Sequence, residues 1–390
     1  MTIHRPDSAE DLSHLFREAA GEGRRLELRG GGSKAAVGAG REAEIVDMRG
    51  FAGVVDYDPP ELVLTVRPGT PLVEVEQLVA DQGQMLAFDP FDHGPLFGAA
   101  TGKATIGGIV AAGVAGSGRL MAGGVRDHLL GFTAVSGRGE RFVAGGKVVK
   151  NVTGYDLPKL IAGSWGRLAA MTELTLKVLP RPRVLRTMAI EGLGPAAAQA
   201  AMACAMGSPA EIGAAAHHPP LEDRPALTLF RVQGFAPSVD ARCAALPRLL
   251  GAHGRVVALS EADASILWRS IGRVEALADA GTLWRISLPP SASTDIVERF
   301  EALGGRWLLD WAGGLLWLAF DGDPLLVRQA AEMACGHAML VRGPAPLRDH
   351  VPAQHPRPPG VMALETRVRR AFDPTGIFET GRFLDMADAH

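Results

Sequence analysis

The chain has 390 residues, of which 47% are hydrophobic and 21% are charged, and its formal net charge is −3 at pH 7. This composition is ordinary for a globular protein, the lack of a basic run argues against a nucleic-acid partner, and the length favours two domains. The cysteines Cys204, Cys243 and Cys335 stand too far apart for a CxxC metal site or a disulfide framework, so we expect a reducing compartment.

The N-terminal sequence "MTIHRPDSAEDLSHLF" lacks the basic-then-apolar pattern of a signal peptide. No uninterrupted apolar run reaches the about 18 residues that a membrane-spanning helix needs. We therefore expect a cytoplasmic protein that reaches a membrane only indirectly, through a partner.

Helix and strand signals alternate irregularly in the first half. A helix is predicted from Ser8, its N-cap, to Gly21, followed by a strand over 24–29. Residues 53–69 read as two strands around an Asp-Pro-Pro turn. A helix over 70–83 has Thr70 as N-cap, and a strand over 169–180 closes this half. The pattern is α+β and lacks repeated βαβ units.

The second half contains both helix and strand signals. Helices are predicted over 194–207 and 323–336, and strands over 281–289 and 314–320. The stretch 347–360 reads as a loop, and after it come a helix, a turn at Asp373-Pro374 and a docked tail. A linker-like stretch at 178–186 separates the halves, so we expect one domain over 1–180 and a second over 181–390.

Three consecutive glycines follow the strand over 24–29 in "RRLELRGGGSKAAVG". They form either a plain tight turn or a nest, in which successive backbone N–H groups converge on an anion such as phosphate. Arg29 and Lys34 would place positive charge beside such an anion. The motif by itself does not decide between the two interpretations.

Two common nucleotide-binding motifs are excluded by inspection. The stretch "FGAATGKAT", 97–105, has the wrong glycine spacing for a P-loop, and Ala104 stands where Ser or Thr would bind magnesium. No G-x-G-x-x-G sequence follows the first strand, which argues against a nicotinamide dinucleotide fold.

Two further stretches complete a pattern with the glycine loop. "TIGGIVAAGVAGSGR" is dense in Gly and Ala, which allows a close approach either to an extended ligand or to another helix. "KNVTGYDLPKLIAGSWG" joins polar Asn151 and Thr153 to a helix that Asp156 caps. Together with "RGGGSK", these stretches resemble the FAD-binding domain of the vanillyl-alcohol-oxidase family over about residues 10–180.

The resemblance implies an α+β fold: a two-lobed, PCMH-type FAD-binding domain, then a smaller α+β domain whose tail returns to the first. It also implies noncovalent FAD, because the first loop lacks His and Cys. No metal site is expected. Carried over by motif, the FAD-binding residues would be Gly30, Gly31, Gly32, Ser33, Lys34, Pro90, Thr105, Ile106, Gly107, Gly108, Ala112, Gly113, Ser117, Met171 and Thr172. For Thr105 and Ser117 the alternative is a core hydroxyl.

A narrower resemblance covers nearly the whole chain. "QGQMLAFDPF", "GTLWRISLP", "LLDWAGGLLWL" and "CGHA" resemble the smaller FAD-domain subunits of bacterial glycolate oxidases. This implies an FAD-binding subunit that supports oxidation of glycolate to glyoxylate and transfers electrons to partners. The implied partners are a larger catalytic flavin subunit and an iron–sulfur subunit, with a small hydroxy acid as substrate. The complex would lie peripherally on the inner face of the membrane.

The alternative is a self-sufficient FAD oxidoreductase that acts on a 2-hydroxy acid or a sugar lactone. The His-rich metal motif of the catalytic relatives has no match here, which favours the accessory subunit. Arg285 and His337 are the candidate catalytic residues, although each also fits a structural role, Arg285 in a strand and His337 in a helix-end turn. A docking surface or a core would explain the aromatic residues of the second half, Trp268, Trp284, Trp307, Trp311 and Trp317.

Overall fold

The computed structural model describes residues 2–147, 154–220 and 224–383. Asn151 and Thr153, named above, lie outside the described residues. The chain divides into two compact units. The first comprises residues 1–115, 123–181 and 356–390, and the second comprises 116–122 and 182–355. One boundary between the units therefore falls next to residue 180. Residues 116–122, from the first half of the sequence, belong to the second unit, and residues 356–390, from the second half, belong to the first unit.

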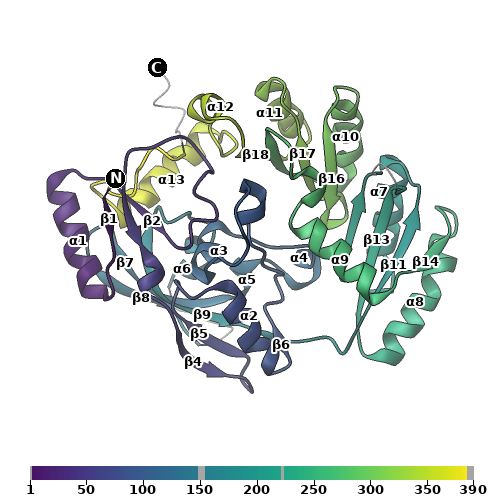
Figure 1. Ribbon diagram of the computed structural model, residues 1–390, viewed down its shortest axis with the longest axis horizontal. Coiled ribbons are helices and arrows are strands. Elements are labelled where there is room, and N and C mark those ends of the chain that lie inside the picture. The colour runs from purple at the N-terminus through teal and green to yellow at the C-terminus, as the bar shows by residue number, and fades with distance from the viewer. Residues whose placement is uncertain (1, 148–153, 221–223, 384–390) are drawn as a thin grey trace. The chain divides into compact units, whose positions relative to one another are not determined.

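The smaller lobe of the first unit is a three-stranded parallel sheet in the order β1-β3-β2, flanked by one helix (Figure 1). Its strands are β1 (Ile3–His4), β2 (Leu26–Arg29) and β3 (Glu44–Asp47). Helix α1 (Ala9–Glu22) begins at Ser8, whose hydroxyl accepts the Asp11 N–H at 3.1 Å, as predicted. The helix continues past Gly21 and ends at Glu22, with Gly23 as its C-cap.

The larger lobe of the first unit is a five-stranded antiparallel sheet in the order β4-β5-β9-β7-β8. Its strands are β4 (Val54–Asp58), β5 (Val63–Val66), β7 (Leu129–Ser136), β8 (Arg141–Gly145) and β9 (Ala169–Lys177). The predicted turn between β4 and β5 and the predicted strand β9 are confirmed.

Helix α2 (Leu72–Asp81) forms where predicted but with a different N-cap. Pro71 is the cap residue, and the Thr70 hydroxyl instead accepts the Gly53 N–H at 2.9 Å and donates to the Arg67 carbonyl at 2.7 Å. Thr70 therefore fixes the loop before the helix. The sequence pattern could not distinguish these two uses of a hydroxyl, because the bond to the Arg67 carbonyl is as local as a cap bond and nothing near Thr70 marks its contact with Gly53, 17 residues away.

The other elements of the first unit connect or cover these sheets. They are η1 (Met48–Gly50), β6 (Gln84–Met85), η2 (Gly94–Phe97), α3 (Ile106–Ala112), α5 (Val125–His128), α6 (Leu157–Ile161), β10 (Leu179–Pro180) and α13 (Pro359–Phe372). Asp156 caps α6 as predicted. Apolar side chains of α2, α3 and α6 pack with those of β5, β7 and β9 in one core.

The predicted docked tail after α13 is confirmed. The Asp373 carboxylate accepts the backbone N–H groups of Ile377 at 3.0 Å and Phe378 at 2.8 Å, which makes the turn. Phe378 then packs edge-on against Phe16 of α1, with 5.2 Å between ring centroids. Burial of these side chains attaches the tail to the smaller lobe of the first unit.

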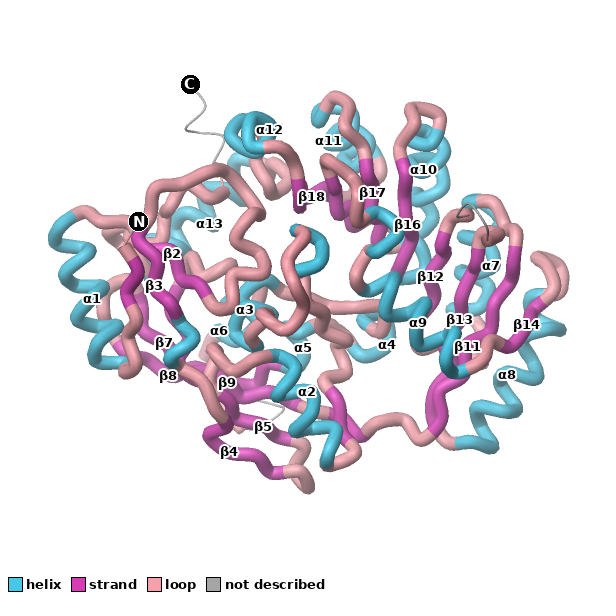
Figure 2. The backbone as a smooth tube through the Cα atoms, in the orientation of Figure 1, coloured by secondary structure: helices cyan, strands magenta, loops and turns pink. Residues whose placement is uncertain are grey.

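The second unit is built on an eight-stranded antiparallel sheet in the order β14-β11-β13-β12-β16-β17-β15-β18, drawn in magenta in Figure 2. The strands are β11 (Val184–Glu191), β12 (Ala214–His218), β13 (Leu227–Gly234), β14 (Val256–Ala258), β15 (Leu283–Ser287), β16 (Arg306–Asp310), β17 (Leu315–Ala319) and β18 (His337–Arg342).

Helices pack on this sheet and bury most of the second unit's apolar side chains. They are α7 (Pro195–Met206), α8 (Ala236–Leu250), α10 (Ser293–Glu301) and α11 (Pro324–Met333). The unit also contains α4 (Arg119–Ala122), α9 (Glu261–Gly272), η3 (Glu275–Leu277), η4 (Pro290–Ala292), η5 (Trp311–Gly313) and α12 (Ala345–His350). No described helix of the chain is both long and apolar enough to cross a membrane.

The structure decides one open alternative in the second half and corrects one expectation. Trp284, Trp307, Trp311 and Trp317 are each at most 5% exposed, so they belong to the interior and cannot form a docking surface. The stretch 347–360 is not entirely a loop, because α12 extends to His350 and α13 begins at Pro359. In apolar runs such as "LLWLA", every residue is buried, so the sequence pattern gives no sign of which face is solvent-exposed.

Candidate cofactor site

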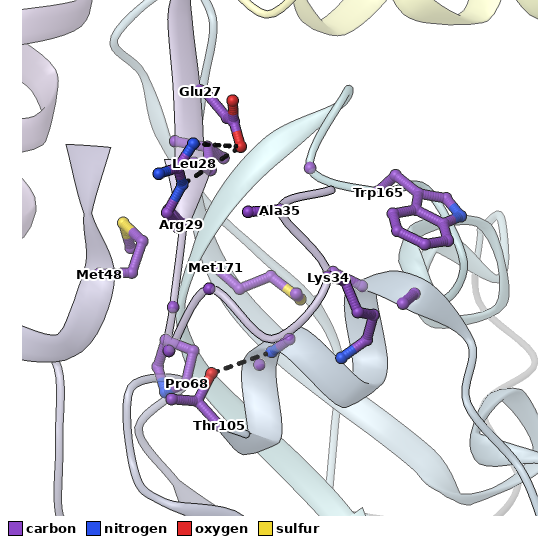
Figure 3. Close-up of a pocket in the computed structure, with 18 of the residues that line it drawn as sticks. Glu27, Leu28, Arg29, Lys34, Ala35, Met48, Pro68, Thr105, Trp165 and Met171 are labelled. Atoms are coloured by element: carbon purple, nitrogen blue, oxygen red, sulfur yellow. Dashed lines mark hydrogen bonds and ion pairs between the residues drawn. The ribbon is translucent and has the colours of Figure 1, made fainter. Parts of the chain in front are cut away.

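A cavity of about 100 Å³ in the first unit is lined by the glycine loop and by the start of α3. Figure 3 shows Lys34, Thr105 and Trp165 around the loop. The lining residues come from both lobes of the unit: Glu27, Leu28, Arg29, Gly30, Gly31, Gly32, Ser33, Lys34, Ala35, Met48, Pro68, Thr105, Gly107, Gly108, Ala111, Ala112, Trp165, Gly166, Ala169, Ala170, Met171 and Arg382.

Close packing against Lys103 and Thr105 explains two of the three loop glycines. A Cβ added at Gly31 would lie 1.4 Å from the Lys103 carbonyl oxygen, and one added at Gly30 would lie 2.2 Å from the Thr105 hydroxyl oxygen. The loop is therefore pressed against the segment that precedes α3. A side chain at either position would displace the loop or that segment.

The loop leaves backbone donors available at the cavity. Within the described residues, the N–H groups of Gly31, Gly32, Ser33 and Lys34 donate to no protein acceptor. Four successive donors beside a cavity are the arrangement that binds a phosphate group. This finding favours the nest over the plain turn, and it fits the pyrophosphate of FAD.

Lys34 supplies a buried cation beside these donors. Its side chain is 8% exposed, and its amino group lies 3.4 Å from the Ser33 hydroxyl. Burial lowers the pKa of Lys34 to about 8; the positive charge of Arg382 acts in the same direction, and the negative charge of Asp92 opposes it. An anion bound in the cavity would raise the pKa of Lys34 again and so keep its amino group protonated.

One buried carboxylate organises the arginines around the cavity. Glu27, 5% exposed, accepts hydrogen bonds from Arg41 at 2.7 Å and from Arg29 at 3.0 Å (Figure 3 shows the second pair). Burial is the largest single influence and would raise the pKa of Glu27, but the hydrogen bonds from Arg41 and the positive charges of Arg41, Arg382 and Arg29 together lower it. Two arginines sharing one carboxylate leave a net positive charge, which again suits an anionic ligand.

The C-terminal tail completes the site through Arg382. Its guanidinium donates to the Val37 carbonyl at 3.0 Å and to the Lys34 carbonyl, and it stacks 4.9 Å from the Trp165 ring. Desolvation lowers the pKa of Arg382 to about 9, and the nearby Arg41 adds to the effect. Arg382 therefore ties the tail to the loop that carries the free donors.

The predicted FAD-binding residues fall into two groups. Those that line the cavity are Gly30, Gly31, Gly32, Ser33, Lys34, Thr105, Gly107, Gly108, Ala112 and Met171. Those outside its lining are Pro90, Ile106, Gly113, Ser117 and Thr172. Ile106 is fully buried in the apolar core, and the Thr172 hydroxyl donates to the Thr133 carbonyl at 3.3 Å.

Ser117 belongs to the second unit, where its hydroxyl donates to the Asp310 carboxylate at 2.8 Å. Thr105 caps α3 by accepting the Gly108 N–H at 3.3 Å. Sequence reasoning missed Glu27, Trp165 and Arg382. Their roles depend on contacts between distant parts of the chain, and no local pattern marks them.

Arg285 and His337, the candidate catalytic residues, both lie in the second unit on neighbouring strands. Arg285 is in β15, while His337 begins β18 and is not in a helix-end turn. Neither lines the cavity of the first unit. Among the described residues, no group of three or more His, Cys, Asp or Glu side chains could hold a metal ion.

Comparisons with known proteins identify the fold and the cofactor. The structure matches that of 4-ethylphenol oxidase from Gulosibacter chungangensis with a TM-score of 0.71, over 99% of this chain and 90% of that one, at 15% sequence identity. A family model described as an FAD binding domain matches residues 2–145. The chain thus has the PCMH-type FAD-binding fold, and its cofactor is FAD.

Relatives found by sequence similarity show to which family of FAD-binding proteins the chain belongs. Glycolate oxidase subunit GlcE of Escherichia coli is 34% identical over 378 residues, which are 96% of this chain and 97% of the relative. Glycolate oxidase subunit GlcD of Bacillus subtilis is 31% identical over 135 residues, 35% of this chain and 27% of that protein. The chain belongs to the family of FAD-linked oxidoreductases that includes the GlcE subunit of glycolate oxidase.

Proposed function

We propose that this chain is the FAD-binding subunit of a glycolate oxidase complex. In that complex it would support the oxidation of glycolate to glyoxylate. The observation that carries the proposal is the 34% identity to E. coli GlcE, because it extends over nearly the full length of both chains. A similarity confined to the FAD domain would have supported only a flavoprotein of undefined substrate.

The residues of the cavity suggest how the chain holds its cofactor. The free N–H groups of the Gly31–Lys34 loop and the Lys34 ammonium would bind the pyrophosphate of FAD. The described residues that line the cavity include no Cys or His to form a covalent link, so we propose that FAD is held noncovalently. When bound, FAD supplies the two-electron acceptor that oxidation of a CH–OH group requires.

We propose that partner subunits carry out the main oxidation of the substrate and accept the electrons. The matches to proteins named as two different glycolate oxidase subunits support a multisubunit assembly. A larger catalytic flavin subunit would carry the main substrate-oxidising site, and an iron–sulfur subunit would accept the electrons. Through these partners the complex would lie peripherally on the inner face of the cytoplasmic membrane.

An anaerobic titration tests this function. We expect that glycolate reduces the flavin of the purified chain slowly or not at all. Rapid bleaching of the visible absorbance of oxidised flavin should appear when partner subunits are added. Stopped-flow absorbance measures both rates. A matched sample with D-lactate in place of glycolate reports the substrate preference.

Rapid and complete bleaching by the isolated chain would contradict the accessory role. It would favour the alternative, a self-sufficient FAD oxidoreductase acting on a 2-hydroxy acid. Absence of glycolate oxidation by the assembled complex would instead overturn the proposed substrate.

A further inference from the structure

Arg285 lies on a strand of the second unit with few partners for its charge. In the described part of the chain its guanidinium makes one hydrogen bond, to the Ser287 hydroxyl at 3.5 Å, the limit of such a contact. No described carboxylate oxygen lies within 4.0 Å of it. Most of its five N–H donors are therefore available to a ligand.

Two aromatic rings lie next to the Arg285 guanidinium. It stacks 5.0 Å from the Trp311 ring and 6.0 Å from the Trp317 ring. Surrounding protein desolvates Arg285 and lowers its pKa to about 10, with the charge of Arg119 acting in the same direction and that of Asp310 opposing it. The residue is half-buried, and its guanidinium nitrogens are not among the described polar atoms that are both enclosed and without a hydrogen-bond partner.

Strand register places other polar groups beside Arg285. Arg285 pairs directly with Trp317 and with Met339, and two residues further along β15 Ser287 pairs with His337. Directly paired residues point to the same face of a sheet, as do residues two apart on one strand. Arg285, Ser287 and His337 therefore share one face, opposite to that of the buried Trp284.

The charges of this cluster do not balance. Arg119 stacks 4.6 Å from the Trp311 ring, so two guanidinium groups share this indole. A carboxylate near Arg285 is that of Asp310, which accepts the Ser117 hydroxyl at 2.8 Å and the backbone N–H of Trp311 at 2.7 Å. With two cations and one carboxylate, the cluster carries an excess positive charge next to unfilled donors.

We propose that Arg285, against Trp311 and beside Ser287, binds the carboxylate of a small 2-hydroxy acid. The proposal rests on the proposed function for its substrate class. The planar fork of a guanidinium matches a carboxylate through two parallel hydrogen bonds, and the aromatic rings exclude water that would weaken them. Ser287, on the same face of the sheet, provides a hydroxyl group that can hydrogen-bond with the substrate's hydroxyl.

Isothermal titration calorimetry of the full-length, FAD-loaded chain tests this site under anaerobic conditions. The probes are glycolate and its uncharged amide, glycolamide. We expect glycolate to bind and glycolamide to bind at least about tenfold more weakly, because a charge-assisted bidentate pair is lost. Glycolate binding should also change the tryptophan fluorescence, and Trp311→Phe should remove much of that change.

Three variants locate the site. Arg285→Met should weaken glycolate binding about tenfold or more, and Arg285→Lys should have an intermediate effect, because an ammonium keeps the charge but loses the fork. Arg306→Met is the matched control: Arg306 lies on β16 of the same sheet and pairs with exposed Asp279 at 2.8 Å. It should leave the affinity unchanged. FAD content and the circular dichroism spectrum verify folding of each variant.

Two results overturn the inference: equal affinity for glycolate and glycolamide, or wild-type glycolate affinity in both Arg285 variants. Neither affects the proposed function if the assembled complex still oxidises glycolate. Conversely, Arg285-dependent binding together with a complex that does not oxidise glycolate would retain the carboxylate site and reject the proposed function.

Discussion

Replacing Gly31 by alanine is expected to abolish FAD binding, with an affinity loss of about 100-fold or more. The new Cβ would lie 1.4 Å from the Lys103 carbonyl oxygen, so the loop or its neighbour must move. Either movement displaces the free N–H donors, and loss of two charge-assisted hydrogen bonds amounts to about 3 kcal/mol. Gly31→Asp would add a negative charge and should be at least as damaging.

Equilibrium titration of FAD into the deflavinated chain measures this effect. Gly21→Ala is the control, because a Cβ at this position of α1 meets no atom within 4 Å. Gly32→Ala should show a smaller loss, since the nearest atom is 3.7 Å away and the cost comes mainly from its φ of +76°. If Gly31→Ala binds FAD like the wild type, the loop is a plain turn.

FAD affinity is expected to fall as the pH rises above about 8, because Lys34 loses its proton in this range. Its pKa is about 8 in the FAD-free chain, and bound pyrophosphate should raise it. Binding above this pH then takes up a proton, which predicts an affinity about tenfold weaker at pH 9 than at pH 7. Lys34→Met should bind more weakly at pH 7 and lose most of this pH dependence.

The stability of the folded, FAD-free chain depends on pH in the opposite sense to FAD affinity. Lys34 keeps its proton up to about pH 10.5 in the unfolded chain but only to about 8 in the folded, FAD-free one. The unfolded state therefore binds more protons between these values, and this group makes the folded state more stable as the pH rises through that window. Lys159→Met, at an exposed lysine paired with Asp156, should change neither profile. An unchanged pH dependence in Lys34→Met would contradict the assignment.

Local signals in the sequence predicted much of the first unit. The Ser8 cap, the strand before the glycines and the Asp156 cap appear where expected, because each depends on a few neighbouring residues. The glycine loop was identified for the same reason. Its geometry was not predictable, since Gly31 is needed to approach Lys103, a contact that the sequence does not indicate.

Non-local contacts account for what the sequence could not predict. Arg382 reaches the Lys34 carbonyl across 348 positions of sequence, so nothing near the loop marks its role. The segment 116–122 continues the glycine-rich stretch after α3, yet it belongs to the second unit. Ser117 is therefore beside Asp310, although its motif suggested a flavin contact.

The most direct test of the account is the fate of the flavin when the purified chain is denatured in acid. We expect a yellow protein that carries about one FAD per chain, and FAD should remain in the supernatant after precipitation, because the cavity offers backbone donors and Lys34 but no Cys or His among its described lining residues. Absorbance and chromatography of the supernatant give the amount and identity of the flavin. Flavin that stays with the precipitated protein, or a chain purified and reconstituted without any flavin, would contradict a noncovalent FAD site at this loop.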